Sequence, residues 1–293
     1  MLHTLLYFLA LFCLSTSANW AKLNHMPVEV LGFYRLALAA TLLGVWLFVF
    51  YKKPWPRLNK NIFWVLLSGA FFFTHLWTFK YASKNTTISN TMIIFSSNPI
   101  WSSLGAVIFF KEKLTARLFI SYILAFAAIF MLVGHGFSLA PETNKGDISS
   151  FFSAILFALY MLTGKKARVY YDNQYYSLIQ YSVCALLFAA CVGYSGAAWT
   201  GYDDVSWWAV VGVVLLPTFL GHFTMTYLVT YMNLSLMTCG KLIEPVIASL
   251  LAAAMFNETL SPYAPYSFAL TIAAVVVLFE PQLRNVMRFA RLK

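Results

Sequence analysis

Long apolar stretches alternate along the chain with short polar segments. A helix that crosses the hydrocarbon core of a bilayer needs about 20 predominantly apolar residues. Ten stretches meet this requirement, approximately residues 3–21, 28–50, 62–81, 87–110, 116–134, 147–164, 174–194, 206–230, 234–256 and 262–280. The pattern predicts an all-α integral membrane protein with ten transmembrane helices.

The ninth stretch differs from the others because it carries Lys241, Glu244 and Pro245 within its apolar sequence. A charge at the centre of a bilayer costs roughly 2.5 to 3.5 kcal/mol, so charged residues in a span usually face a protein interior or a water-filled path. Lys241 and Glu244 are spaced i, i+3, which favours an ion pair on one helix face. Pro245 has no N–H for the carbonyl of Lys241, and a kink with a polar notch is expected beside the charges.

The same stretch has a counterpart 146 residues earlier in the chain. Residues 87–115 align without a gap on residues 233–261, which places Pro99 on Pro245 and Glu112 on Glu258. Matches between alanines and leucines mean little in so apolar a chain, but a proline and a glutamate at the same separation in both copies indicate an internal duplication.

Composition supports a membrane location, with 61% hydrophobic residues, 10% charged residues and a mean hydropathy of +0.73. The net charge of +10 could suggest a nucleic-acid partner, but the basic residues lie mainly in short loops between spans, where they set orientation. The cysteines all lie in apolar stretches and are expected to be small core residues rather than a disulfide framework. They are Cys13, Cys184, Cys191 and Cys239.

The loop charges predict that both termini are cytoplasmic. With this orientation the inside segments hold fourteen basic residues: Lys52, Lys53, Arg57, Lys60, Lys111, Lys113, Arg117, Lys165, Lys166, Arg168, Arg284, Arg288, Arg291 and Lys293. The outside loops hold four, Lys22, Lys80, Lys84 and Lys145, whereas Arg35 and Lys241 lie within spans. This asymmetry follows the positive-inside rule.

Five spans in each half give the two copies opposite orientations. We expect a first repeat over residues 1–137, a linker over 138–146 and a second repeat over 147–293 with a short basic tail. Residues 4–18 followed by SANW also resemble a cleavable signal peptide, although no basic segment precedes them and the repeat gives them a partner near residues 150–164. Inverted repeats are typical of transporters that bind substrate near the bilayer midplane.

These motifs together resemble the EamA-type ten-helix carriers of the drug/metabolite transporter superfamily. The similarity rests on the two proline helices ending in Glu-x-Leu-Ser/Thr, on the Pro27-x₇-Arg35 spacing and on the segment GHFTMTYLVTYMNLSLMTCGKLIEPVIA. The resemblance implies transport of amino acids, amines, vitamins or nucleotide-type metabolites. The first copy has Asn98-Pro99 where the second has Glu244-Pro245, so an ionic role belongs to the second half.

Polar groups within the spans are the candidate binding residues. Lys241 could hold a substrate carboxylate or phosphate and Glu244 an amine or a coupling proton, or the two could form a structural ion pair. Arg35 could reach a cavity or extend to the outer interface near Glu29. His75 and His222 occupy nearly equivalent positions in the two halves, where each could relay a proton, with His222 the candidate for coupling, or be structural.

Aromatic and amide side chains complete the candidate set. Trp77, Trp101 and Tyr160 could line a pocket, but aromatic residues make up 18% of the chain and most must pack or lie at interfaces. Asn98 could face a cavity or bridge two helices. Pro99 and Pro245 are the expected hinges.

No catalytic or nucleotide-binding motif occurs, so we expect neither an enzyme nor a cofactor or metal site. The predicted function is secondary active export or exchange of a small polar metabolite, most simply an amino acid or a related zwitterion or anion, across a bacterial inner membrane. A lipid flippase, a passive channel and an intramembrane enzyme remain alternatives. The expected partners are the small-molecule substrate, membrane lipids and a proton as candidate coupling ion, without nucleic acid.

The orientation can be tested by single-cysteine labelling of intact cells with a membrane-impermeant reagent. We expect a cysteine at Lys145 to be labelled from outside and a cysteine at Lys166 only after permeabilisation, because the basic residues favour the cytoplasmic side. Labelling of both positions from one side would rule out opposite orientations of the two halves.

Overall fold

A computed structural model of the protein describes residues 2–51, 54–56, 59–86, 88–133, 141–257, 260 and 262–290. Glu258 and residues 138–140 of the expected linker lie outside these ranges. Within them the chain is helical and contains no strand. The elements are α1 (Leu2–Ser15), α2 (Ser17–Leu23), α3 (Val28–Val49), α4 (Ile62–Asn85), α5 (Ile88–Phe95), α6 (Asn98–Phe110), α7 (Ala116–Val133), η2 (Pro141–Thr143), α8 (Asn144–Ala167), α9 (Asn173–Ser195), α10 (Asp204–Val213), η3 (Val214–Phe223), α11 (Thr224–Leu228), α12 (Leu234–Gly240), η4 (Lys241–Ile243), α13 (Glu244–Phe256) and α14 (Ala264–Ala290).

Each expected span coincides with a helix or with a run of consecutive helices. In the described chain, eight such stretches are long and apolar enough to cross a membrane, and two shorter apolar helices, Ala116–Leu132 and Ala264–Glu280, coincide with the fifth and tenth expected spans. The sixth span begins earlier than expected, at Asn144. Asp147 in its first turn accepts hydrogen bonds from Thr86 and Asn90, so this polar end of the helix is held in place.

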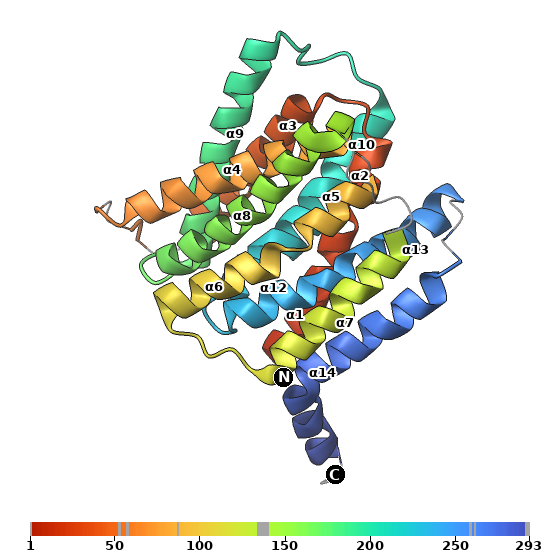
Figure 1. Ribbon diagram of the computed structural model, residues 1–293. Helices are drawn as coiled ribbons and strands as arrows, with labels where there is room; N and C mark the ends of the chain where they lie inside the picture. Colours follow the sequence, from red (N-terminus) through yellow and green to blue (C-terminus); the bar gives the residue numbers. More distant parts are fainter. Residues whose placement is uncertain are drawn as a thin grey trace.

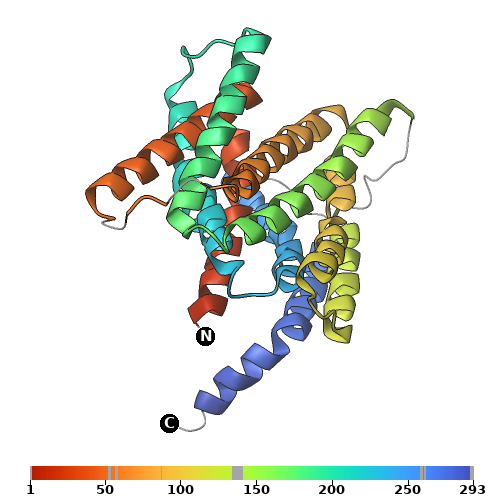
Figure 2. The ribbon, with the colours of Figure 1, turned by 90° about the vertical axis from the view of Figure 1, so that its left-hand side faces the viewer.

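The helices form one bundle in which elements from the two halves of the sequence pack side by side. The closest associations join α4 to α8, α3 to α9 and α7 to α14, with α1 against η3 and α6 against α12 (Figures 1 and 2). Both chain ends lie toward the same end of the bundle in the two views. No half is therefore self-contained, because the core lies between them.

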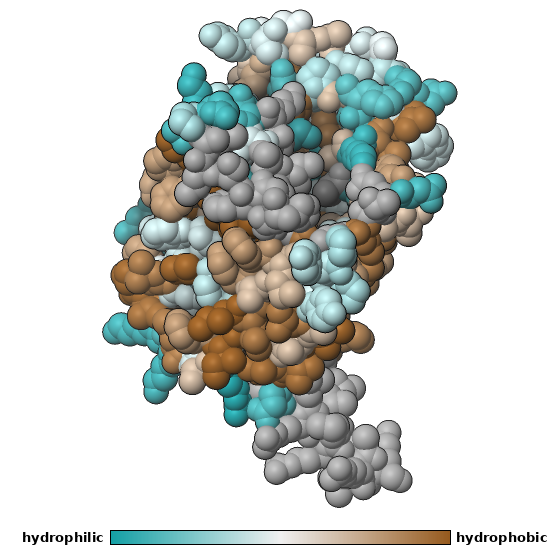
Figure 3. All heavy atoms as spheres, turned by 45° about the vertical axis from the view of Figure 1, so that its right-hand side comes forward, coloured by the Kyte–Doolittle hydropathy of each residue, from teal (hydrophilic) through white to brown (hydrophobic). Residues whose placement is uncertain are grey.

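Large hydrophobic side chains also cover the outer surface. Phe48, Leu186 and Trp208 are each more than two-thirds exposed. Hydrophobic residues occupy much of the face in Figure 3, while hydrophilic ones gather toward its ends. A water-soluble protein rarely exposes so large an apolar area, but lipid chains would cover it. The described surface is therefore that of a multi-pass membrane protein.

Small residues allow close helix contacts in the core. At Gly32 of α3, an added Cβ would lie 2.7 Å from three ring carbons of Phe188 on α9. Gly105 of α6 is similarly close to Leu162 of α8, at 2.3 Å. Such small residues are typical of membrane helix interfaces, where packing rather than the hydrophobic effect holds helices together.

The four cysteines are unpaired, and three of them are buried.

Replacing Gly32 tests the contact between α3 and α9. We expect Gly32→Ala to destabilise the protein by about 1 to 3 kcal/mol, because the methyl group overlaps the Phe188 ring and forces it to move. Gly193→Ala on α9 is the matched control, since no atom lies within 4 Å of its added Cβ. Thermal unfolding in detergent measures both, and equal melting temperatures would contradict the close packing.

Candidate functional site

The ninth span is interrupted at the predicted place. Helix α12 ends at Gly240, a single 3₁₀ turn covers Lys241–Ile243, and α13 starts at Glu244 with Pro245 in its first turn. Proline is tolerated in the first turn of a helix because the N–H it lacks would be unpaired there anyway. Pro99 stands likewise in the first turn of α6, just after α5 ends at Phe95. In both copies a new helix therefore begins next to the proline.

The ion pair expected from the i, i+3 spacing is present. Lys241 Nζ lies 2.9 Å from Glu244 Oε1, and the two side chains are 9% and 23% exposed. The ammonium group also lies 4.6 Å from the centre of the Phe157 ring on α8, a favourable cation–π position. Lys241 therefore connects the break in the ninth span with the sixth span.

Arg35 on α3 is buried and only partly hydrogen-bonded. Its Nε donates to Thr218 Oγ1 at 2.8 Å, whereas its Nη2 has no hydrogen-bond partner among the described residues. Thr218 lies in η3, a π-helical segment that contains Pro217, and its hydroxyl also donates to the carbonyl of Val213. Arg35 thus points inward to the eighth span, which decides against extension to the outer interface.

The two histidines lie among aromatic rings. His75 Nδ1 is 2.9 Å from Ser153 Oγ, and its ring stacks on Phe95 and meets Phe157 edge-on, with centroids 5.4 and 5.1 Å apart. His222 lies edge-on to Phe72, with centroids 4.9 Å apart. Phe157 thus contacts both His75 and Lys241.

Tyr160 lies between these groups and has an unused hydroxyl. Its ring packs against Phe72 at 4.7 Å and Phe157 at 5.7 Å between centroids. The residue is 1% exposed, yet its OH has no hydrogen-bond partner in the described chain. A buried polar group without a partner costs about 1 to 3 kcal/mol. Tyr160 and Arg35 therefore both present unsatisfied donors inside the protein.

We refer to Arg35, His75, Tyr160, His222, Lys241 and Glu244 as the central cluster. Its residues come from α3, α4, α8, η3, η4 and α13, so both halves contribute. Phe157 contacts His75, Tyr160 and Lys241. The ring of Tyr160 in turn lies 6.4 Å from that of His222, between centroids. Arg35 and Lys241 carry two positive charges against the one carboxylate of Glu244, which makes the cluster a region of positive potential suited to an anionic group.

The other candidate residues are Trp77, Trp101 and Asn98. Trp77 stacks on Tyr81 and is 43% exposed, and Trp101 packs edge-on to Phe151 while its Nε1 lies 3.3 Å from Ser97 Oγ. Asn98 is buried and donates to the carbonyl of Phe95, but its Oδ1 has no partner in the described part of the chain. Asn98 is thus linked to the central cluster through Phe95, whose ring stacks on His75.

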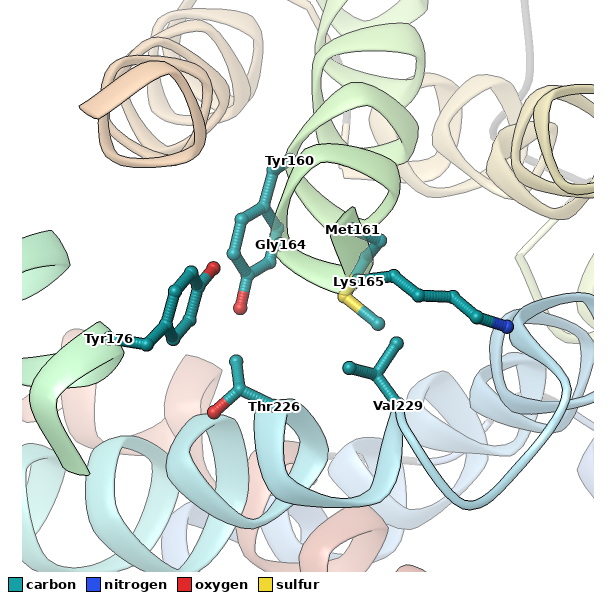
Figure 4. A pocket seen from close by; sticks show the side chains of 7 residues that line it. All are labelled: Tyr160, Met161, Gly164, Lys165, Tyr176, Thr226 and Val229. Carbon is teal, nitrogen blue, oxygen red and sulfur yellow. The ribbon is translucent and has the colours of Figure 1, made fainter. Parts of the chain in front are cut away.

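A small pocket adjoins the central cluster. It is lined by Tyr160, Met161, Gly164, Lys165, Tyr176, Thr226 and Val229 (Figure 4). In Figure 4 the hydroxyls of Tyr160 and Tyr176 lie on one side, and the Lys165 side chain extends away on the other. Thr218, Phe157 and Thr226 were not anticipated as site residues, because none of these positions carries a charge.

Comparison with known proteins identifies relatives over nearly the whole chain. The model of the EamA-like transporter family matches residues 1–134 and 144–280. An uncharacterised transporter from Archaeoglobus fulgidus is 24% identical over 262 residues, which cover 86% of this chain and 88% of the relative. A solved crystal structure superimposes with a TM-score of 0.80 at 18% identity, covering 97% of this chain and 98% of the other, and shares the fold.

The unpaired hydroxyl of Tyr160 gives a stability test of the site. We expect Tyr160→Phe to leave the ligand-free protein as stable as before or slightly more so, because the hydroxyl makes no hydrogen bond. Tyr7→Phe is the control: Tyr7 OH donates to the carbonyl of Met237 at 2.6 Å, and its loss should cost about 0.5 to 1.5 kcal/mol. A marked loss of melting temperature in Tyr160→Phe would show that the hydroxyl is structural.

Proposed function

The chain belongs to the EamA-like transporter family, and from this premise we propose that it is a secondary transporter, an exporter or exchanger, of a small anionic or zwitterionic metabolite. An amino acid is the simplest solute of this kind. The observation that carries the proposal is the central cluster, in which buried basic groups exceed carboxylates and Arg35 Nη2 and Tyr160 OH have no hydrogen-bond partner among the described residues. A bound carboxylate would satisfy both donors. Family membership favours transport over catalysis.

The proposed mechanism is alternating access between two inverted five-helix repeats. Three features support it. Each proline helix begins directly after a break in its span, and helices α6 and α13 are each followed by a residue in the left-handed conformation at positions 146 apart. Helices from opposite halves also pack against each other throughout the bundle. The left-handed residues are Lys111, with φ 54°, and Asn257, with φ 53°. Pro99 and Pro245 would be the hinges. The proposed arrangement has ten transmembrane helices and cytoplasmic termini in a bacterial inner membrane.

Within the cluster we assign different roles to the charged groups. Arg35 and Lys241 bind the anionic group of the solute, and the carboxylate of Glu244 binds its amine or carries the coupling proton. His222 is the second candidate for proton coupling, because its ring lies against Phe72 and Tyr160 within the cluster and an imidazole can both donate and accept a proton. Lys241 and Glu244 neutralise each other at 2.9 Å when no solute is bound.

Three variants separate solute binding from a structural ion pair: Lys241→Met, Glu244→Gln and the double variant. If the pair binds solute, each single variant should lose binding and counterflow in proteoliposomes, and the double variant should remain inactive although folded. If the pair only supports the fold, each single change should cost about 3 to 5 kcal/mol, because it leaves one buried charge alone, and the double change should cost less. Recovery of transport in the double variant would contradict the proposal.

A thermal-shift screen against amino acids would supply the ligand for these assays, since a ligand at a hundred times its Kd stabilises the folded protein by about 2.7 kcal/mol.

His25→Gln is the matched control for the Lys241 and Glu244 variants, because it removes the exposed pair that His25 makes with Asp203 at 2.8 Å, outside the cluster. Its counterflow should equal that of the wild type. If Glu244 instead carries the coupling proton and does not contact the solute, Glu244→Gln should lose pH-driven uptake but retain exchange, and only Lys241→Met should lose counterflow.

A further inference from the structure

Glu112 connects the first half of the chain to the start of the ninth span. It lies just after α6 and its side chain is 6% exposed. Its Oε1 accepts from the backbone N–H of Leu234 at 2.9 Å, and its Oε2 accepts from the N–H and hydroxyl of Ser235 at 3.2 and 3.0 Å. The first N–H groups of a helix lack partners within the helix, and a carboxylate there is stabilised by the helix dipole. Glu112 thus caps α12 from the other repeat.

Lys165 joins a third helix to the same carboxylate. It lies in the last turn of α8, its Nζ is 2.5 Å from Glu112 Oε1, and it lies 4.9 Å from the centre of the Phe110 ring. Burial opposes ionisation of Glu112, but the hydrogen bonds from Lys165, Leu234 and Ser235 outweigh it and hold the pKa of the carboxyl below its ordinary value. The carboxylate form therefore persists at neutral pH.

This contact lies at one end of the pocket that adjoins the central cluster. Lys165 lines the pocket together with Tyr160, and it stands five residues further along α8, roughly 7.5 Å nearer the end of that helix. Figure 4 shows its side chain leaving the pocket on the side away from the two tyrosine hydroxyls. The contact of Lys165 with Glu112 thus lies between Tyr160 and the end of α8 at Ala167.

A related contact occurs at the end of helix α13. Lys22 of α2 lies 4.6 Å from the centre of the Phe256 ring, and Phe256 is the residue 146 positions after Phe110. In each case a lysine from one half contacts the phenylalanine that ends the proline helix of the other half.

We infer that Glu112 and Lys165 form a latch that closes the solute path at the end of the bundle where α8 finishes, and that separating them opens the pocket to that side. The inference rests on the proposed transport function, since it assigns a role within the same path. Because Glu112 stays bound to α12 through Leu234 and Ser235, opening moves α8 away from the joined pair α6 and α12. Opening then separates Lys165 from Glu112.

Access to a cysteine inside the pocket tests the latch without a substrate. Val229→Cys places a thiol in the pocket wall, in a background carrying Cys191→Ser because Cys191 is the native cysteine that is not fully buried. Lys165→Gln removes the charge that binds Glu112 and leaves the cap of α12 in place. Glu112→Gln removes the charge while retaining an acceptor for the backbone N–H groups. The same variants without Val229→Cys give the blank.

We expect both latch variants to raise the labelling rate of Cys at 229 by a membrane-impermeant maleimide on the order of tenfold, from the side that labels Lys166→Cys and not from the other. Arg117→Gln is the control, because it breaks a more exposed ion pair, with Glu280 at 3.0 Å, away from the pocket. Its labelling rate should not change.

Unchanged labelling in folded Lys165→Gln protein, or equal increases from both sides, would overturn the inference. If Glu112→Gln does not fold because α12 loses its cap, Lys165→Gln alone decides. Failure of the latch and failure of the transport proposal are distinguishable: unchanged labelling refutes the latch whatever the flux, whereas a protein that labels as expected but moves no solute would refute transport and leave only the contact that covers the pocket.

Discussion

The hydrocarbon core of a bilayer offers no water to a backbone carbonyl or a charged side chain, and this constraint governs where the helices of the protein are interrupted. Each break in the described chain is compensated by side chains. At the ninth span, Lys241 and Glu244 pair across the 3₁₀ turn. At the fourth, Asn98 donates to the carbonyl of Phe95. At the eighth, the hydroxyl of Thr218 binds the carbonyl of Val213 within the π-helical segment. A buried polar atom that has no hydrogen-bond partner therefore points to a candidate binding site, because the polar groups at these breaks do have partners.

The sequence was sufficient for the membrane class, the positions of the spans and the ion pair at Lys241 and Glu244, because length, hydropathy and i, i+3 spacing are local properties. It could not show that Arg35 meets Thr218 or that Glu112 meets Leu234, since these residues are 183 and 122 positions apart and their contacts depend on how helices pack. In the sequence, Glu112 belongs to the repeated motif and Lys165 is one of the basic residues between spans. The recurrence of a glutamate thirteen residues after each proline was the available signal for the cap.

The fourth and ninth spans share backbone features but differ in the side chain that precedes the proline. Both fourth and ninth spans restart at a proline and end in a left-handed residue, but the first has neutral Asn98 where the second has Glu244. The two helices therefore start and end in the same way, while only the second contributes a charge, Glu244, to the central cluster.

The π-helical segment Val214–Phe223 also bears on how this protein should be aligned with others. A π-turn closes its hydrogen bonds between residues five apart and so holds more residues per turn than an α-helix. Under the 146-residue offset, His75 corresponds to Gly221, one position before His222. The ring of His75 lies against Phe95 and Phe157, whereas that of His222 lies against Phe72 and Tyr160. An ungapped alignment of the two halves therefore pairs His75 with a glycine, and a single-residue gap inside the π-helical segment is needed to pair the two histidines.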